Sequence, residues 1–333
     1  MSDRVFIIAE AGVNHNGDVD LAKKLIDVAA DAGADAVKFQ TFKAGNMVSK
    51  DTPKAEYQKT DKQSDGGQLE MLRKLELDEA AHIDLMRYAE EKGIMFMSTP
   101  FDHDSIELLN RLGLKIFKIG SGDLTNVPYL RHIARLNKKI ILSTGMADMN
   151  EISLSLKVLL DSGVAIDHIT LLHTNTAYPT AYSDVNLRAM TSIAEEFGTK
   201  VGYSDHTPGI EVPVAAVAIG AELIEKHFTL SRDMEGPDHK ASLEPTELKA
   251  MVSAIRNIEL AMGDGIKKPS KSELQNVTAA RKSIVALCDI KSGEVFCESN
   301  LSVKRPGNGI SPFKWDQLIG TRAEKDYKKD ELI

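Results

Sequence analysis

Residues 5–40 read VFIIAEAGVNHNGDVDLAKKLIDVAADAGADAVKFQ and contain one complete strand–helix–strand unit. The runs Val5–Glu10 (VFIIAE) and Ala36–Gln40 (AVKFQ) are rich in apolar and β-branched residues, which favours two buried strands. Between them, Val19–Ala32 carries apolar residues at three- and four-residue spacing, which predicts an amphipathic helix. Gly33 follows directly and is a typical helix stop.

The same pattern recurs along most of the chain. Six further strand-like runs each end in a polar or glycine-containing turn: Ile94–Thr99, Ile116–Gly120, Ile140–Thr144, Ile169–Thr174, Val201–Asp205 and Leu223–Phe228. Glycine also ends the helical stretches in EEKGIMF, DSGVAI and EEFGTKV. No GxGxxG or P-loop turn follows a strand. Eight β–α units over roughly 260 residues therefore predict an α/β fold of the (β/α)8 TIM-barrel type rather than an open doubly wound sheet.

The chain of 333 residues is longer than one barrel. We predict a barrel over residues 1–262, a linker over 263–276 (within GDGIKKPSKSEL) and a small, mainly β domain over 277–333, with the runs SIVALC, EVF and LSVKR. So short a domain buries only a modest core, so we expect it to dock on the barrel or on a second subunit. The polar segment Glu56–Lys74 is predicted to be a loop over the barrel mouth.

Composition excludes several classes of protein. Lys+Arg 41 against Asp+Glu 49 gives a net charge of −8, and 42% hydrophobic with 27% charged residues is typical of a globular chain. The acidic balance argues against nucleic acid, and no run approaches the ~20 apolar residues of a membrane helix. The N-terminus lacks a signal-peptide pattern, and two cysteines, Cys288 and Cys297, make no disulfide framework. We expect a cytoplasmic protein.

Polar side chains follow the predicted strands at the end where barrel enzymes carry their active sites. They are Glu10, Lys38, Gln40, Thr99, Lys118, Ser121, Ser143, His173, Asn175, Ser204, His206, Glu225 and His227. Strand alternation places Lys38 and Gln40 on one face, with Val37 and Phe39 on the other. The pairs Ser204 with His206 and Glu225 with His227 follow the same alternation.

Two histidines and two acidic residues in this set are open to more than one interpretation. His206 and His227 lie on adjacent strands and can share one divalent metal, or they can be hydrogen-bonded core histidines. Glu10 can act as a general acid or base, or only as a counter-ion. Asp238, in the loop GPDHK, can bind sugar hydroxyls or shape a turn.

Lys38 and Lys118 stand inside otherwise apolar strands, where a lysine needs compensation. They can form structural ion pairs with Glu10 or Glu225, or one of them can form a Schiff base. They can also bind a phosphate or carboxylate together with the nearby serine hydroxyls. Two lysines among hydroxyl groups favour the anion site.

A series of short motifs occurs in a fixed order from Glu10 to Ile310: IAEAGVNHNG, AVKFQTF, STPFD, FKIGSGDLTN, ILSTGM, LLHTNTAYPT, GYSDHT, EKHFT, GPDH and VKRPGNGI. Together they resemble the N-acetylneuraminate (sialic acid) synthase family. KAEYQ…QLEMLRKLEL, GSGDLTN and HTNTAYPT with DVNLRAM are most similar to the bacterial legionaminate-type synthases.

The resemblance implies a metal-dependent transferase that condenses phosphoenolpyruvate with an open-chain N-acylated amino sugar, giving a nine-carbon 2-keto acid and phosphate. The sugar would be 2,4-diacetamido-2,4,6-trideoxymannose or N-acetylmannosamine. The metal would be Mn²⁺, with Mg²⁺ or Co²⁺ as alternatives. A related phosphoenolpyruvate-dependent keto-acid synthase would lack the KRPGNG module, and a Schiff-base barrel aldolase would need no metal.

The same resemblance assigns roles to individual residues. His206 and His227 match metal ligands, and the positions that hold phosphoenolpyruvate are Lys38, Thr99, Lys118, Ser121, Ser143, Tyr178 and Ser204. Glu10, Gln40 and Asp238 match the sugar side, with Glu10 as the proton shuttle and Asp123 as a second candidate acid or base. The C-terminal domain resembles the antifreeze-like (SAF) domain, which implies a domain-swapped homodimer in which Arg305 reaches the N-acyl group of the sugar.

Overall fold

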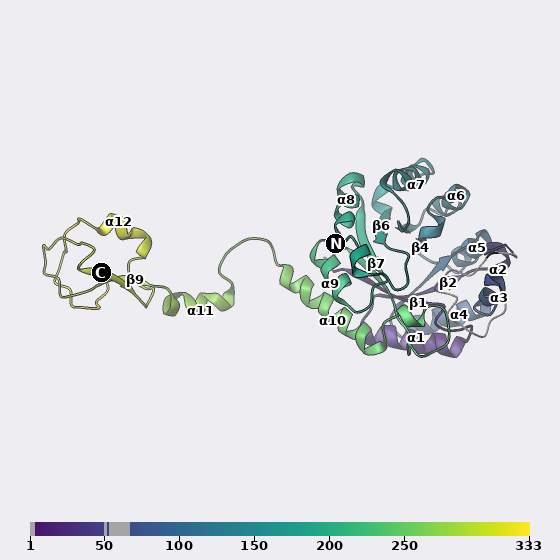
Figure 1. Cartoon of the computed structure of the whole chain (residues 1–333), viewed down its shortest axis with the longest axis horizontal. Helices are drawn as coiled ribbons and strands as arrows, with labels where there is room; N and C mark the ends of the chain where they lie inside the picture. The colour runs from purple at the N-terminus through teal and green to yellow at the C-terminus, as the bar shows by residue number, and fades with distance from the viewer. Residues whose placement is uncertain (1–3, 50–51, 53–66) are drawn as a thin grey trace. The chain divides into compact units, whose positions relative to one another are not determined.

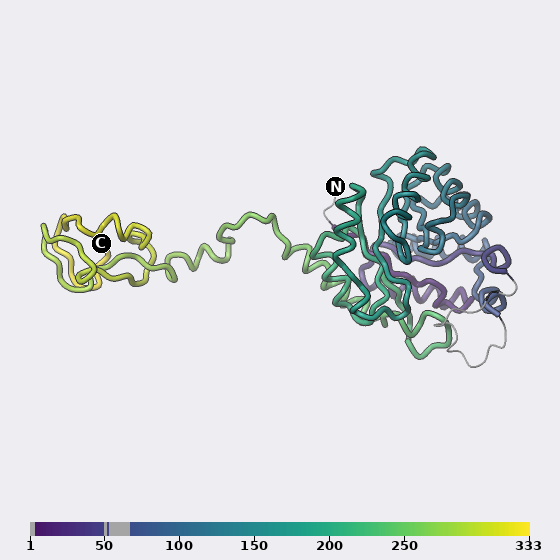
Figure 2. Tube along the Cα trace, turned by 45° about the horizontal axis from the view of Figure 1, so that its top comes forward, coloured from purple at the N-terminus to yellow at the C-terminus, as the bar shows by residue number. Residues whose placement is uncertain are grey.

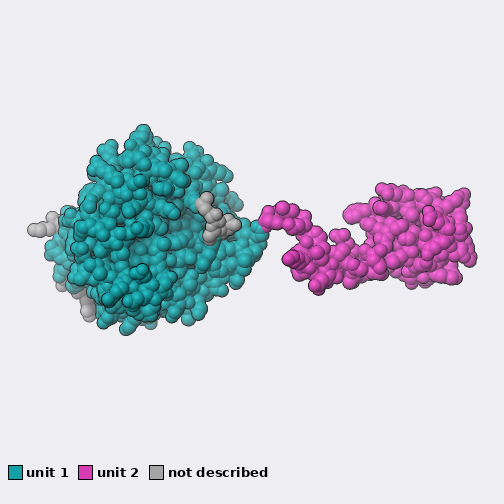
Figure 3. Space-filling model, turned by 180° about the vertical axis from the view of Figure 1, so that it is seen from behind, with its two compact units in different colours: residues 1–263 teal, residues 264–333 magenta. Residues whose placement is uncertain are grey.

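The computed structural model describes residues 4–49, 52 and 67–333. The chain divides into two compact units, residues 1–263 and residues 264–333, which Figure 3 colours separately. Each unit has its own buried core.

The first unit is built on eight parallel strands in the order β3-β2-β1-β8-β7-β6-β5-β4. Their bounds are β1 Phe6–Gly12, β2 Ala36–Thr41, β3 Met95–Pro100, β4 Ile116–Ile119, β5 Lys139–Ser143, β6 Ile169–Thr174, β7 Lys200–Asp205 and β8 Leu223–His227. The outermost strands β3 and β4 pack against each other, so the sheet curls into a nearly closed barrel (Figure 1). The predicted TIM barrel is confirmed, and all eight predicted strands are present.

Helices alternate with these strands and surround the sheet, and the path of the chain can be followed in Figure 2. They are α1 Val19–Ala32, α2 Ala44–Met47, α3 Gln68–Arg73, α4 Glu79–Glu91, α5 His103–Arg111, α6 Val127–Arg135, α7 Met149–Asp161, α8 Arg188–Phe197, α9 Glu211–Ala218 and α10 Pro245–Met262. Short 3-10 turns are η2 Ser121–Asp123, η3 Ile166–His168, η4 Tyr182–Asp184 and η5 His239–Ala241. None of the helices in the described part of the chain combines the length and the apolarity needed to cross a bilayer.

The predicted loop Glu56–Lys74 is only partly described. Residues 56–66 lie outside the described residues, whereas Gln68–Arg73 form helix α3, so the prediction of a loop is wrong for this part. Leu72 of α3 is buried in a small apolar cluster with Val13 and Phe42. The polar composition of the segment as a whole hid this short helix.

Helix α1 shows how the local sequence sets the element bounds. The Asp18 carboxylate caps its N-terminus and accepts hydrogen bonds from the backbone N–H groups of Asp20 and Leu21. Gly33 ends it in the left-handed region at φ 80°. The other three predicted glycine stops also have positive φ: Gly93, Gly163 and Gly198. The sequence rule for helix ends is thereby confirmed at all four positions.

The inside of the barrel is filled in layers, because alternate residues of each strand point inward. The lower layer is apolar and consists of Ile8, Ala36, Met97, Ile141, Leu172 and Leu223, with Phe6 and Ile116 packed against it. At Gly202 a Cβ would lie 2.3 Å from the Leu223 carbonyl oxygen, so β7 can approach β8 there only without a side chain. This layer closes the barrel beneath its carboxyl-terminal mouth.

The second unit is small and mixed in structure. It contains α11 Lys271–Ala280, the antiparallel strands β9 Ser283–Ala286 and β10 Leu301–Lys304, the turn η6 Pro312–Lys314 and α12 Trp315–Leu318. Its core is formed by Ile284, Ala286, Ile290, Phe296, Leu301 and Ala323. The predicted run EVF is not a strand and contributes only an isolated bridge between Val295 and Arg322.

Helix α11 begins inside the segment predicted to be a linker. Ser270 and Glu273 form a capping box at its N-terminus, which starts the helix. None of its residues is buried. The pattern Ser270-x-x-Glu273 is the sequence sign of this helix start, and it lies within the stretch that was predicted to be a linker.

Candidate active site

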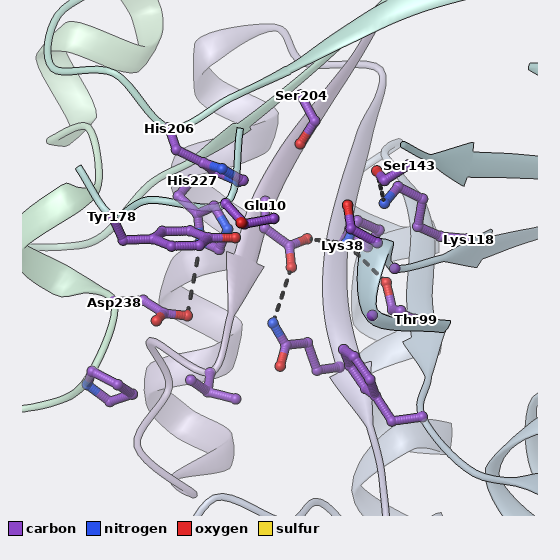
Figure 4. Close-up of a pocket in the computed structure, with 18 of the residues that line it drawn as sticks. Glu10, Lys38, Thr99, Lys118, Ser143, Tyr178, Ser204, His206, His227 and Asp238 are labelled. Atoms are coloured by element: carbon purple, nitrogen blue, oxygen red, sulfur yellow. Dashed lines mark hydrogen bonds and ion pairs between the residues drawn. The ribbon is translucent and has the colours of Figure 1, made fainter. Parts of the chain in front are cut away.

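A layer of polar side chains lies directly above the apolar layer of the barrel. Each strand contributes one residue, placed two positions beyond an inward-facing residue below it: Glu10, Lys38, Thr99, Lys118, Ser143, Thr174, Ser204 and Glu225. These residues line a cavity of about 390 Å³ at the carboxyl ends of the strands (Figure 4). This is the place where barrel enzymes carry their chemistry.

Four buried charged groups form the floor of this cavity. Lys38 Nζ lies 2.7 Å from Glu10 Oε2 and 3.7 Å from Glu225 Oε2, and Lys118 Nζ lies 3.6 Å from Glu225 Oε1. Each ammonium group also donates to a hydroxyl oxygen, Lys38 to Thr99 at 2.9 Å and Lys118 to Ser143 at 2.7 Å. The ion-pair interpretation is thus correct as geometry, and the hydroxyl groups required for an anion site are present as well.

Burial and charge give the two glutamates opposite behaviour. Burial raises the pKa of Glu10 to about 7 against the opposing effect of Lys38. Burial also acts against ionisation of Glu225, but Lys118 and Lys38 outweigh it and lower the pKa of Glu225 to about 2. Near neutral pH the floor therefore takes up a proton at Glu10, which moves its net charge from zero towards +1. That change favours an anionic ligand.

The two lysines differ in the same way. Burial disfavours the charged form of Lys38, but Glu10 and Glu225 outweigh it and raise the Lys38 pKa. For Lys118 burial prevails and its pKa is lowered. Lys38 is therefore a fixed cation at neutral pH.

The two histidines lie together on the other side of the cavity, where Figure 4 shows their rings beside Tyr178. The ring centroids of His206 and His227 are 5.4 Å apart, and that of Tyr178 is 4.0 Å from His206. Burial lowers the pKa of His206 to about 4 and that of His227 well below 6.5. Both imidazoles are therefore neutral, which is the state that a metal ligand requires.

The nitrogen atoms of these rings fit a cation. His206 Nδ1 lies 2.5 Å from the Asn175 carbonyl oxygen, so it carries the proton and leaves the Nε2 lone pair available. His227 Nδ1 is buried without a hydrogen-bond partner, 3.9 Å from Asp238 Oδ2. Across the described part of the chain, no group of three or more His, Cys, Asp or Glu residues is arranged to hold a metal. Two protein ligands would thus leave the remaining coordination positions to water or substrate.

Three polar side chains predicted on the sugar side converge around Gly12, which has φ +54°. A Cβ added there would lie 3.4 Å from Glu10 Oε1, Gln40 Nε2 and Asp238 Oδ2. Burial raises the pKa of Asp238 to about 6. Carboxyl and amide groups this close together can bind neighbouring hydroxyl groups of one sugar.

Within the first unit, the predicted residues Ser121 and Asp123 differ in whether they line the cavity. Ser121 lines it and accepts a hydrogen bond from the Gly145 N–H at 3.0 Å. Asp123 lies outside the lining, and its Oδ1 accepts from the Asn126 side chain at 3.1 Å, so the structure gives it the role of a turn residue. Arg305 belongs to the second unit, where its Nε donates to the Ala280 carbonyl.

The sequence grouped His173 of β6 and Asn175, which follows it, with the inward-facing residues, but neither lines the cavity. His173 Nε2 bonds to the Val185 carbonyl oxygen and its ring packs on Tyr203, outside the barrel. Leu172 and Thr174 point inward instead, and Thr174 lines the cavity with Thr176. The strand alternation set by Leu172 was the signal that would have identified Thr174.

An apolar side of the cavity was not predicted at all. Its lining includes Val13, Met47, Met71, Leu72, Leu75 and Phe101, which come from the segments after β1, β2 and β3 and from α2 and α3. We refer to these six residues as the apolar wall. Two of them, Met71 and Leu72, lie in the segment Glu56–Lys74 that was predicted to be a polar loop, so no apolar periodicity was expected there.

Comparison with known proteins gives consistent matches over both units. A model of the NeuB family matches residues 25–267, and a model of the SAF domain matches residues 281–333. The chain is 58% identical over 330 residues to an N,N'-diacetyllegionaminic acid synthase of Campylobacter jejuni subsp. jejuni, with 99% of each chain covered. It is 48% identical to an enzyme of the same name from Legionella pneumophila, with 95% of this chain and 90% of that protein covered.

A solved structure also resembles this chain. The N-acetylneuraminic acid (sialic acid) synthetase of Leptospira borgpetersenii serovar Hardjo-bovis, in complex with citrate, superposes with a TM-score of 0.71 at 35% identity. The match covers 82% of this chain and 90% of that chain.

Proposed function

The chain belongs to the NeuB family, and on this premise we propose that it is a nonulosonic acid synthase. It condenses phosphoenolpyruvate with an open-chain N-acylated amino sugar and water, giving a nine-carbon 2-keto acid and phosphate. The observation that carries this proposal is the cavity floor, where two buried lysines with hydroxyl partners lie beside two neutral imidazoles. Few other reactions need an anion site and two adjacent metal-ligand side chains in one barrel mouth.

We assign the sugar as 2,4-diacetamido-2,4,6-trideoxymannose and the product as N,N'-diacetyllegionaminate. The support is the 58% identity over nearly the whole chain to a synthase of that product name, against 35% for the solved sialic acid synthetase. N-acetylmannosamine, leading to N-acetylneuraminate, is the alternative substrate.

Phosphoenolpyruvate would lie on the cavity floor. Lys38 and Lys118 offset its negative charges, and the hydroxyl groups of Thr99, Ser121 and Ser143 supply neutral donors. A low-dielectric barrel mouth strengthens each of these interactions. Tyr178 and Ser204 complete the proposed set; both line the cavity, and Ser204 Oγ donates to Glu225 at 3.1 Å.

We propose that His206 and His227 hold a divalent cation, most simply Mn²⁺, with Mg²⁺ or Co²⁺ as alternatives. The buried, unpartnered Nδ1 of His227 and the tautomer that Asn175 imposes on His206 support this proposal. When bound, the cation would polarise the aldehyde oxygen or lower the pKa of a water molecule.

The chain's own residues then supply the remaining chemistry. C3 of phosphoenolpyruvate forms a carbon–carbon bond to the aldehyde carbon, and the aldehyde oxygen becomes a hydroxyl group by taking a proton from Glu10. Water adds to the cationic C2 and gives one proton to the Glu10 carboxylate, which restores the acid. The tetrahedral intermediate then forms the C2 ketone as its C–O bond to phosphate breaks, and phosphate leaves with the electron pair and takes up the remaining hydroxyl proton. Glu10 suits the proton transfer because its pKa of about 7 lies near the working pH.

The second unit has a proposed part in sugar binding. As a SAF domain it would cover the site of a partner subunit in a domain-swapped homodimer, with Arg305 reaching the N-acyl group. We propose Glu10 rather than Asp123 as the proton carrier, because Asp123 bonds within a turn and does not line the cavity. We also propose a cytoplasmic site of action, in keeping with the free thiols of Cys288 and Cys297.

A phosphate-release assay tests this function. Purified full-length protein with Mn²⁺ and phosphoenolpyruvate should release phosphate on addition of 2,4-diacetamido-2,4,6-trideoxymannose, and less efficiently with N-acetylmannosamine. Absence of phosphate release with both sugars would contradict the synthase function. Equal kcat/KM for the two would contradict the sugar assignment alone.

The Schiff-base alternative is tested in the same preparation. Lys38 is engaged with two carboxylates that raise its pKa, which is unfavourable for an amine nucleophile, whereas burial lowers the pKa of Lys118 and makes it the lysine to examine. Under the synthase proposal, borohydride with substrate should trap no adduct at either lysine, and EDTA should stop the reaction. The opposite pair of results would favour an aldolase.

A further inference from the structure

The cavity has two chemically different sides. His206, His227 and Asp238 follow β7 and β8, and Figure 4 shows them grouped on one side with Tyr178. The apolar wall belongs to the segments after β1, β2 and β3. These six side chains offer no donor or acceptor for a hydroxyl group, and Gln68 is the polar residue of α3 that lines the cavity with them. Such a wall needs an explanation in a site that handles a polyhydroxylated substrate.

The position of the lysines determines which part of the sugar faces the wall. Phosphoenolpyruvate on the floor contacts Lys38 and Lys118, just above the apolar layer of the barrel. The sugar aldehyde must touch C3 of phosphoenolpyruvate, so its first carbon lies deep. The rest of the sugar chain extends past Gln40 and Asp238 towards the mouth, where Met47 and Met71 lie on α2 and α3.

We infer that the apolar wall receives the methyl end of a 6-deoxy amino sugar and so selects it over a sugar with a 6-hydroxyl group. This inference rests on the proposed function and names the feature that determines its substrate. A methyl carbon gains by leaving water for the contacts of Met71 and Leu72. A hydroxyl group against the six wall side chains loses its water partners and finds no replacement among them.

The wall is built as part of the fold. Leu72 and Leu75 are buried in an apolar cluster with Val13, Phe42 and Ala44, and Met47 and Met71 pack against that cluster while lining the cavity. The wall is therefore anchored by neighbours outside the cavity. Leu69, on the same helix as Met71, packs on the cluster but does not line the cavity, and so provides a matched control.

The test compares kcat/KM for 2,4-diacetamido-2,4,6-trideoxymannose with that for N-acetylmannosamine in full-length variants loaded with Mn²⁺. Met71→Gln and Met47→Gln keep side-chain length but add an amide to the wall. Each should lower the ratio of the two kcat/KM values by about tenfold. Leu69→Gln and the apolar replacement Met71→Leu should keep the wild-type ratio. Thermal unfolding of each variant checks that it is folded.

The outcomes separate the two proposals. An unchanged ratio in folded Met71→Gln and Met47→Gln overturns the role of the wall and leaves the synthase function intact. A wild-type protein that uses both sugars equally overturns the wall inference together with the sugar assignment and leaves the synthase function intact. A wild-type protein that releases phosphate with neither sugar overturns the proposed function first.

Discussion

Lys226 Nζ lies 2.5 Å from Asp205 Oδ2, and both side chains are fully buried on the outward face of β7 and β8. Asp205 also accepts hydrogen bonds from the backbone N–H and the hydroxyl group of Thr207, each at 3.0 Å. Lys226 donates in addition to the Thr207 carbonyl oxygen. The pair thus joins the residue before His206 to the residue before His227 and fixes the strand ends that carry both imidazoles.

We predict that Asp205→Asn lowers the free energy of unfolding by about 3–5 kcal/mol, because Lys226 would remain buried without its counter-ion. Adding Lys226→Met to this variant should recover a large part of the loss, since both charges are then gone. Urea unfolding followed by circular dichroism measures both effects. A loss below about 1 kcal/mol in the single variant would contradict the buried pair.

The acid role of Glu10 predicts a pH profile with a definite sign. The pKa of Glu10 is raised to about 7, and its protonated form both donates to the new hydroxyl group and spares the anion site a negative charge. kcat/KM should therefore fall as the pH rises above about 7. Glu10→Gln should lose this limb and reduce kcat by about 10²–10⁴. Near-wild-type kcat in Glu10→Gln with both substrates bound normally would remove the assignment.

Metal removal should stop the reaction. Treatment with EDTA is expected to abolish phosphate release, and added Mn²⁺ should restore it. His206→Gln and His227→Gln should weaken Mn²⁺ binding at least about tenfold, measured by the paramagnetic resonance signal of the free ion. His173→Gln is the matched control, because that imidazole bonds to the Val185 carbonyl away from the cavity. Full activity in metal-free protein would refute the cation proposal.

We predict that the burial of His15 lowers the free energy of unfolding in acid. Burial lowers its pKa from 6.5 to about 4, and its Nε2 is buried without a partner. Above pH 6.5 the ring is neutral in both the folded and the unfolded chain, so it has no pH effect. Between pH 6.5 and 4 the unfolded chain binds the extra proton, so stability falls, by about 3 kcal/mol at most for this one group.

The variant His15→Asn isolates that contribution. Its side-chain oxygen can still accept the hydrogen bond that His15 Nδ1 receives from the Gly17 N–H at 3.0 Å. Wild type should lose stability relative to this variant as the pH falls from 7 to 4, measured by urea unfolding at each pH. A pH-independent difference between the two proteins would show that His15 is not held neutral by the fold.

Strand alternation made the inner face of the barrel predictable from the sequence. Lys38 and Gln40 line the cavity, while Val37 and Phe39 pack in the outer core, as the pattern required. At His173 the sequence located the end of the strand correctly but assigned the side chain to the wrong face of the strand. One residue of offset exchanges the two faces of a strand.

Contacts between segments that are far apart in the sequence could not be predicted from the hydrophobic pattern. Asp205 and Lys226 occupy outward positions where a charge usually reaches solvent, but both are buried on a face against which helix α9 packs. The apolar wall likewise assembles from Met47 and Met71, which are 24 positions apart on two short helices. No local periodicity records that they meet.

The apolar layer formed by Ile8, Met97 and Leu172 with its neighbours fills the barrel below the cavity and closes that side of its interior. In the described part of the chain, Lys38 and Lys118 line a cavity at the carboxyl ends of the strands, and a ligand reaches them from that side. A sugar that entered first would stand in the path of phosphoenolpyruvate. The two substrates should therefore bind in a fixed order. Steady-state kinetics should show compulsory-order addition, with phosphoenolpyruvate binding first.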